Sequence, residues 1–196
     1  MEGCLFHFCQ ALWRHLQEWG LVVMYKDTGA TRLKWFVKRI MALAFLPPDR
    51  IEGMFYYLVQ SKWPQGVPQQ HPPLIGWLRY VQDTWIYNDY FPRHLWSVFY
   101  RVDNRTNNFI ESKHNVFRDV FLVHGPLWTF CARMIVHHRT ELETQHVHSY
   151  GRSPSTRDSA LVTREGQLAA IKGLYTSSQL NDYEYLKRVA YYLKDY

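Results

Sequence analysis

The sequence predicts a mainly α protein. Over most of the chain, apolar residues recur every three or four positions, which is the period of one face of an α-helix. Several of these segments stop at Gly20 or at Pro47 and Pro48, where a helix cannot continue in its regular form. A third observation is the pair Asn181 and Glu184, whose spacing is typical of a capping box at a helix start.

The helical period and its stop signals define the expected elements in order. The segments predicted as helices are 4–19, 30–46, 48–62, 74–87, 107–122 and 126–146. Residues 64–73 are rich in proline and glutamine, so they are expected to form a loop. Residues 95–101 are short and aromatic, and their pattern fits either a turn of helix or a strand.

The composition of the chain changes after residue 148. Residues 149–163 are rich in Ser, Arg, Gly and Pro and poor in apolar groups, which predicts a flexible linker. Residues 164–177 and 181–194 then have the pattern of a helical hairpin. The predicted organisation is a first part at 1–148, a linker at 149–163 and a hairpin tail at 164–196.

Composition and charge limit the function. With 196 residues, of which 47% are hydrophobic and 17% aromatic, the chain can bury a core. A net charge of +6 favours contact with phosphates. Three cysteines do not make a disulfide framework, which points to a reducing compartment. No apolar run approaches the roughly 20 residues of a membrane helix, and polar residues interrupt the N-terminal run, so we expect neither a membrane span nor a signal peptide.

Basic residues form a strip on the second predicted helix. The strip is Arg32, Lys34, Lys38 and Arg39, and it lies opposite an apolar face. Such a strip is either a solvated outer face or a surface that holds DNA, and the pattern leaves both interpretations open.

A C-x2-H pair, Cys4 and His7, opens the first predicted helix on the side away from its apolar stripe. A closed zinc site needs four ligands, so the pair alone is a weak signal. Four more histidines lie close together late in the sequence, at 137, 138, 146 and 148. Nothing in the sequence brings these segments together, so a zinc site is not expected.

Residues 105–114, with the sequence R-T-N-N-F-I-E-S-K-H, place Glu111 near the start of a predicted helix. On a helical wheel, Glu111 shares a face with Asn107 and His114, an arrangement that suits a carboxylate held over a cleft. The alternative is a capping box with Asn108 as the N-cap and Glu111 at the third helical position, without chemistry.

Taken together, the segments 3–14 and 105–114 resemble the transposase domain of Mutator-like elements. Residues 41–47 and 91–97 are similar to its middle section, and the resemblance covers residues 3–145 in order. It implies a ribonuclease-H-like core in which Glu111 is the last of three catalytic carboxylates and binds Mg²⁺ or Mn²⁺. It also implies that Cys4 and His7 brace a helical insertion near the active site, where Asn107, Asn108 and His114 surround Glu111.

The chain departs from this family at one important point. The family's two catalytic Asp precede the C-x2-H segment, whereas here every Asp follows Cys4. The chain is therefore expected to be the C-terminal part of a transposase, a helical insertion plus the last helices of an incomplete core. Two-metal phosphoryl chemistry needs several oxygen ligands, and Glu111 alone cannot hold two ions. We expect no DNA cleavage, and no Mg²⁺ cofactor, for this chain by itself.

The resemblance implies a nuclear protein whose partners are DNA and either the missing catalytic half or a related transposase chain. A function from another class remains open, a non-enzymatic helical interaction module with an aromatic groove. A helical zinc-binding protein is the third interpretation. Transposase descent predicts that Cys4, His7 and Glu111 face one concavity, whereas an interaction module predicts an exposed aromatic groove elsewhere.

Overall fold

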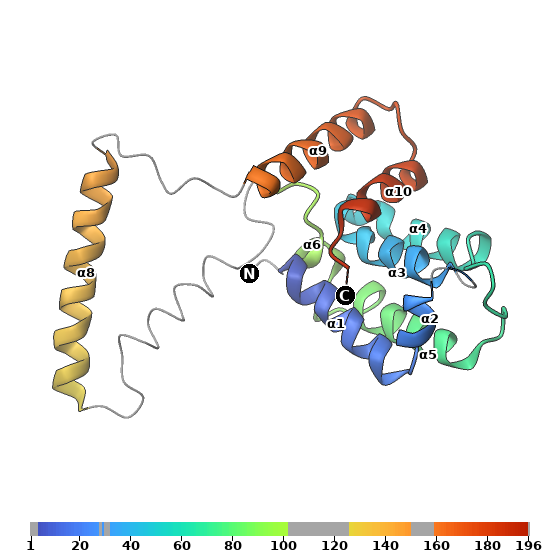
Figure 1. The fold of residues 1–196 in the computed structure, drawn as a ribbon, viewed down its shortest axis with the longest axis horizontal. Helices are drawn as coiled ribbons and strands as arrows, with labels where there is room; N and C mark the ends of the chain where they lie inside the picture. Colours follow the sequence, from blue (N-terminus) through green and yellow to red (C-terminus); the bar gives the residue numbers. More distant parts are fainter. Residues whose placement is uncertain (1–3, 28, 30–31, 102–125, 150–158, 196) are drawn as a thin grey trace. The chain divides into compact units, whose positions relative to one another are not determined.

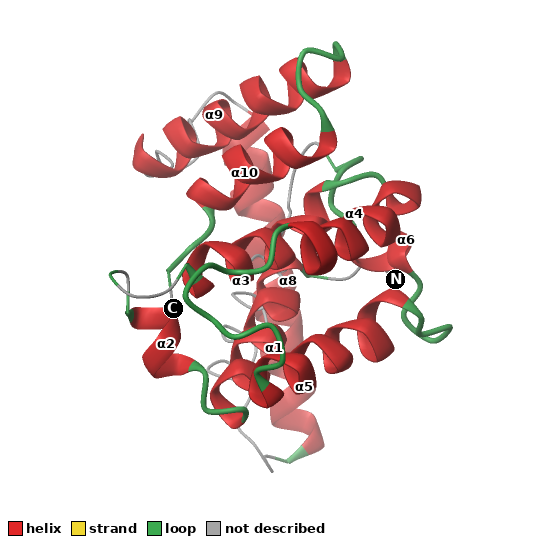
Figure 2. Ribbon diagram, turned by 90° about the vertical axis from the view of Figure 1, so that its right-hand side faces the viewer, coloured by secondary structure: helices red, strands yellow, loops and turns green. Residues whose placement is uncertain are grey.

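The computed structural model describes residues 4–27, 29, 32–101, 126–149 and 159–195. Within these ranges the chain forms nine α-helices, two other helical turns and no strand, so the mainly α prediction is confirmed there. Figure 2 shows helices and loops and no strand in the described residues.

The helices follow one another with the bounds α1 Leu5–Glu18, α2 Val22–Lys26, α3 Leu33–Ala42, α4 Pro48–Ser61, α5 Pro72–Val81, α6 Arg93–Trp96, α8 Leu127–Ser149, α9 Ser159–Thr176 and α10 Asp182–Tyr192. A 3₁₀ turn η1 (Leu43–Phe45) continues α3, and a π-helical turn η2 (Gln82–Ile86) continues α5. The predicted helices at 4–19, 48–62 and 126–146 agree with α1, α4 and α8 to within a few residues. The predicted helix at 107–122 lies outside the described residues.

The chain divides into two compact units. The first combines residues 1–106 with 164–196, and the second is residues 107–163. The sequence-based division treated 164–196 as a tail, but α10 packs against α3 and thus belongs to the first unit. Helix α9 begins at Ser159, inside the segment predicted as a linker.

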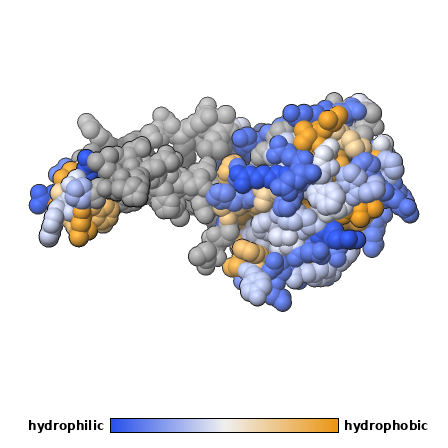
Figure 3. All heavy atoms as spheres, turned by 90° about the horizontal axis from the view of Figure 1, so that it is seen from below, coloured by the Kyte–Doolittle hydropathy of each residue, from blue (hydrophilic) through white to orange (hydrophobic). Residues whose placement is uncertain are grey.

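Helix α3 is the centre of the first unit. It packs against α1, α2, α4 and α10, which Figure 1 shows around it. Its fully buried side chains include Phe36, Val37 and Ile40. Burying each such side chain is worth about 1.5–3 kcal/mol, so this helix organises the core. On the face drawn in Figure 3, hydrophilic residues predominate in this unit, and apolar ones reach the surface in small separate groups.

Two helix ends are fixed by local chemistry. Gly20 has φ +69°, and its N–H donates to the carbonyl of Gln17 at 2.9 Å, while the N–H of Leu21 donates to that of Leu16 at 3.1 Å. This is a Schellman motif, in which glycine adopts the left-handed conformation at low cost. At the start of α10, the Asn181 side chain accepts a 2.9 Å hydrogen bond from the Glu184 N–H, as the sequence predicted.

Several local predictions are corrected. Helix α2 was not predicted, because five residues are too few to show a helical period. Cys4, predicted off the apolar stripe of α1, is buried, since it is the N-cap and not a helical residue. Trp19 follows the last residue of α1, Glu18, and is 44% exposed. Residues 95–101 contain no strand, and the end of α6 occupies their first positions.

Candidate nucleic-acid interface

The structure separates the four basic residues predicted as a DNA-binding strip into two pairs. Lys34 and Lys38 both bind the carboxylate of Asp195, each at 3.0 Å. Arg32 and Arg39 instead line a cavity beside α3. The strip is therefore not one continuous surface, and the two pairs have different chemical roles.

Lys38 is the clearest correction to the predicted strip. Its side chain is only 3% exposed, and its Nζ donates to Oδ1 of Asp195. The ammonium also lies 5.2 Å from the centre of the Trp35 ring. Partial burial raises the pKa of the Asp195 carboxyl, but the hydrogen bonds from Lys38 and Lys34 lower that pKa further. The net result is a pKa below the ordinary value. The Asp195 carboxylate thus offsets part of the positive charge of Lys34 and Lys38. The two lysines are therefore poorly suited to contact phosphates.

Arg32 and Arg39 line a cavity of about 500 Å³, here called the basic cavity. It lies between α3, the chain just after α4, and the first turn of α10. Its lining residues are Arg32, Trp35, Phe36, Arg39, Ser61, Lys62, Trp63, Pro64, Gln65 and Tyr183. The set contains three cations and several aromatic rings, with no acidic side chain.

Backbone and indole hydrogen bonds hold the wall of the basic cavity after α4. The N–H of Arg32 donates to the carbonyl of Gln65 at 2.9 Å, which ties the start of α3 to this segment. The indole N–H of Trp63 donates to the carbonyl of Val67, also at 2.9 Å, and its ring packs on Phe36. These contacts fix Trp63 in one orientation, so the wall is preformed.

Tyr183 forms the opposite wall and gathers two of the cations. Lys62 Nζ lies 4.7 Å from the centre of its ring, and the guanidinium of Arg39 lies 5.6 Å from it. The ring is held in turn by an edge contact with Tyr57 at 5.6 Å and by its place two residues after the N-cap Asn181. A ring face attracts cations through its quadrupole, so Tyr183 brings two positive charges together.

The charged side chains that line the basic cavity are all positive. Among the described residues, no carboxylate lies within ion-pair distance of Arg32, Arg39 or Lys62. Two acidic residues, Asp182 and Glu184, flank Tyr183 in the sequence, and neither lines the basic cavity. The carboxylate of Asp182 accepts a 2.8 Å hydrogen bond from the Tyr175 hydroxyl. A concave site with several cations and no carboxylate favours an anion. Lys62 and Tyr183 were missed by the sequence analysis, because they lie far from the strip along the chain and no local pattern connects them to it.

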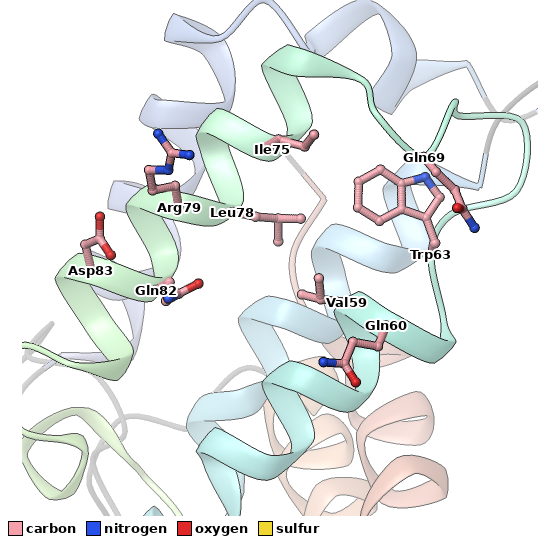
Figure 4. Close-up of a pocket in the computed structure, with 9 residues that line it drawn as sticks. All are labelled: Val59, Gln60, Trp63, Gln69, Ile75, Leu78, Arg79, Gln82 and Asp83. Carbon is pink, nitrogen blue, oxygen red and sulfur yellow. The ribbon is translucent and has the colours of Figure 1, made fainter.

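A second cavity, of about 740 Å³, lies between α4 and α5 (Figure 4). Val59, Ile75 and Leu78 give it an apolar part, and its far end carries both Arg79 and Asp83. The carboxylate and the cation offset each other, so this cavity has no preference for anions comparable with that of the basic cavity. Trp63 lines both cavities.

The residues predicted around a catalytic carboxylate are only partly described. Glu111, Asn107, Asn108 and His114 lie outside the described residues. Cys4, the N-cap of α1, is buried, whereas His7, in the first turn of α1, is exposed. No group of three or more His, Cys, Asp or Glu in the described parts of the chain is arranged to hold a metal ion.

Cys9, the cysteine within α1, is expected to be unreactive. Burial, together with the nearby Cys4, raises the pKa of the Cys9 thiol to about 12. A thiol is a poor nucleophile and metal ligand until it loses its proton, so Cys9 is a core residue. In the described ranges, every helix is too short or too polar to cross a lipid bilayer.

Comparisons with the models of known protein families, with curated proteins and with solved structures found no match. The resemblance to Mutator-like transposases thus stays a prediction from the sequence segments quoted above.

Proposed function

We propose that this chain is a DNA-binding part of a Mutator-like transposase, and that the basic cavity is its DNA-contacting site. The observation that carries the proposal is the convergence of Arg32, Arg39 and Lys62 on a cavity without an acidic residue. Phosphate contacts supply most of the affinity of sequence-independent DNA binding.

The resemblance and the cavity are independent of each other and support the same function. The resemblance was drawn mainly from residues 3–14 and 105–114, and neither segment lines the basic cavity. In an intact relative, Glu111 would act with two upstream Asp on a ribonuclease-H-like core. Two-metal chemistry needs more than one carboxylate and no carboxylate lines the basic cavity, so the function proposed for this cavity is binding.

One observation favours the rival function, a protein-interaction module. Three aromatic side chains after η2 are notably exposed, namely Tyr87, Tyr90 and Phe91. Aromatic residues are enriched in the centres of protein interfaces. These residues are not part of the basic cavity, so the two functions can be tested separately.

The test is a fluorescence anisotropy titration of a labelled DNA duplex with the full chain at several salt concentrations. If the three cations each neutralise one phosphate, log K should fall against log salt with a slope of about −2.7. That slope corresponds to an affinity loss of roughly 40-fold between 50 and 200 mM salt. Absence of binding at the lowest salt, or binding that salt leaves unchanged, would contradict the proposed function. A Tyr90→Ala variant should bind the duplex as the wild type does.

A further inference from the structure

We infer that the basic cavity accepts one unpaired nucleotide, so that the chain binds single-stranded DNA more tightly than duplex DNA. The inference rests on the proposed function, because it takes DNA as the ligand. It adds the form of DNA that is bound, single-stranded and not duplex, which the positive charge alone does not determine.

The size of the basic cavity fits a nucleotide. Pockets for small ligands typically measure about 300–1,000 Å³, and this one measures about 500 Å³. A duplex presents phosphates on its convex outside and keeps its base faces inside the stack, so its bases cannot enter such a concavity. An unpaired nucleotide can place both its base and its phosphate there.

The aromatic walls provide surfaces for a base. Trp35 and Trp63 both line the basic cavity and are only partly buried. Trp63 is fixed by its hydrogen bond to Val67, and Trp35 lies parallel to Tyr191, with ring centres 6.2 Å apart and an interplanar angle of 3°. Rings that are already held in place lose little freedom when a base stacks on them. Sites for single-stranded nucleic acid combine such rings with cations that follow the backbone.

The cations are placed to bind the phosphate of the bound nucleotide and those next to it along the strand. Arg39 and Lys62 meet at the ring of Tyr183, and Arg32, whose backbone N–H donates to Gln65, lines the same cavity. The hydroxyl of Ser61 and the amide of Gln65 are the uncharged polar side chains of the lining. Both groups donate and accept hydrogen bonds, so they do not select one base, and the expected binding is tolerant of sequence.

The experiment compares a labelled oligothymidine of about ten nucleotides with a duplex of equal length, at one salt concentration. The full chain should bind the single strand about 10-fold more tightly than the duplex. Trp35→Leu should weaken single-strand binding by about 10-fold and duplex binding by less than about 2-fold, and Trp35→Phe, which keeps a ring, should recover most of the loss. Thymidine 5′-monophosphate should compete for the site and shift the indole NMR signal of Trp35.

The possible outcomes separate this inference from the proposed function. Binding of neither DNA form would overturn both. Equal or tighter binding of the duplex would overturn the single-strand inference and leave the proposed function standing. Equal losses for both forms in Trp35→Leu, with no recovery in Trp35→Phe, would also overturn the inference, because a structural defect and not a lost stack would then explain the effect. Circular dichroism of each variant establishes that the helical fold is retained.

Discussion

Lys38 and Asp195 are 157 positions apart in the sequence, yet Nζ of the lysine donates a 3.0 Å hydrogen bond to Oδ1 of the aspartate. The lysine is 3% exposed, whereas the aspartate is 59% exposed. The contact joins the middle of α3 to the C-terminal end of the chain and closes the first unit around a buried cation. Lys34, 22% exposed, binds the other oxygen of the same carboxylate.

Removal of the carboxylate should destabilise the fold. Asp195→Ala leaves the Lys38 ammonium buried without its partner, and we expect the free energy of unfolding to fall by about 1–2 kcal/mol. The value is below that of a fully buried pair, because Asp195 is largely exposed and water screens its charge. Lys38→Met should cost less, since it removes the buried charge together with its need for a partner. Urea denaturation followed by circular dichroism measures both changes. A larger loss in Lys38→Met than in Asp195→Ala would contradict this account.

The same contact makes stability depend on pH. The pKa of Asp195 is lowered in the folded state, so the unfolded chain takes up its proton first as the pH falls. The stabilisation is therefore complete above the unfolded aspartate pKa of about 3.9 and is lost as the pH falls through the lower folded value. The difference in unfolding free energy between the wild type and Asp195→Asn should be constant from pH 7 to about 5 and should shrink in more acidic solution. A difference that grows on acidification would contradict a lowered pKa of Asp195 in the folded state.

The turn after α1 depends on a glycine. Gly20 has φ +69°, a conformation that costs an ordinary L-residue roughly 1 kcal/mol. Gly20→Ala should therefore lower the free energy of unfolding by about 1 kcal/mol, although an added Cβ would meet no atom within 4 Å. Gly53 also has open space around it but lies inside α4, so Gly53→Ala should raise stability by about 0.5–1 kcal/mol. Thermal unfolding of the two variants should show shifts of opposite sign, and shifts of the same sign would contradict the assignment.

The fold was predictable where local chemistry determines it. Gly20 ends α1, Pro48 begins α4, and Asn181 caps α10, and each of these signals lies within a few residues of the feature that it predicts. The short α2 lacks a periodic pattern, so nothing in the sequence announces it. Local pattern thus accounts for the helices but not for the way in which they pack.

The candidate site was predictable only in part. Arg32 and Arg39 were selected from the helical strip and do line the basic cavity. Lys38 was selected with them, but its pairing with Asp195 depends on a contact between distant segments. Lys62 and Tyr183 meet only because α10 packs beside α3 and α4, and a helical wheel of α3 contains neither residue. Residues that converge through tertiary packing give no signal at short range.

The most direct test of the account is a comparison of Lys62→Ala with Lys34→Ala in duplex DNA binding. Each variant removes one positive charge from the same unit, but Lys62 lines the basic cavity and Lys34 is bound to Asp195. The account predicts that Lys62→Ala weakens binding by about 5–10-fold and makes the salt slope less steep by about 0.9, as expected for one lost phosphate contact. Lys34→Ala should change the affinity by less than about 2-fold, because Asp195 already neutralises that charge. Equal effects of the two substitutions would mean that only net charge matters and would contradict the assignment of the basic cavity as the binding site.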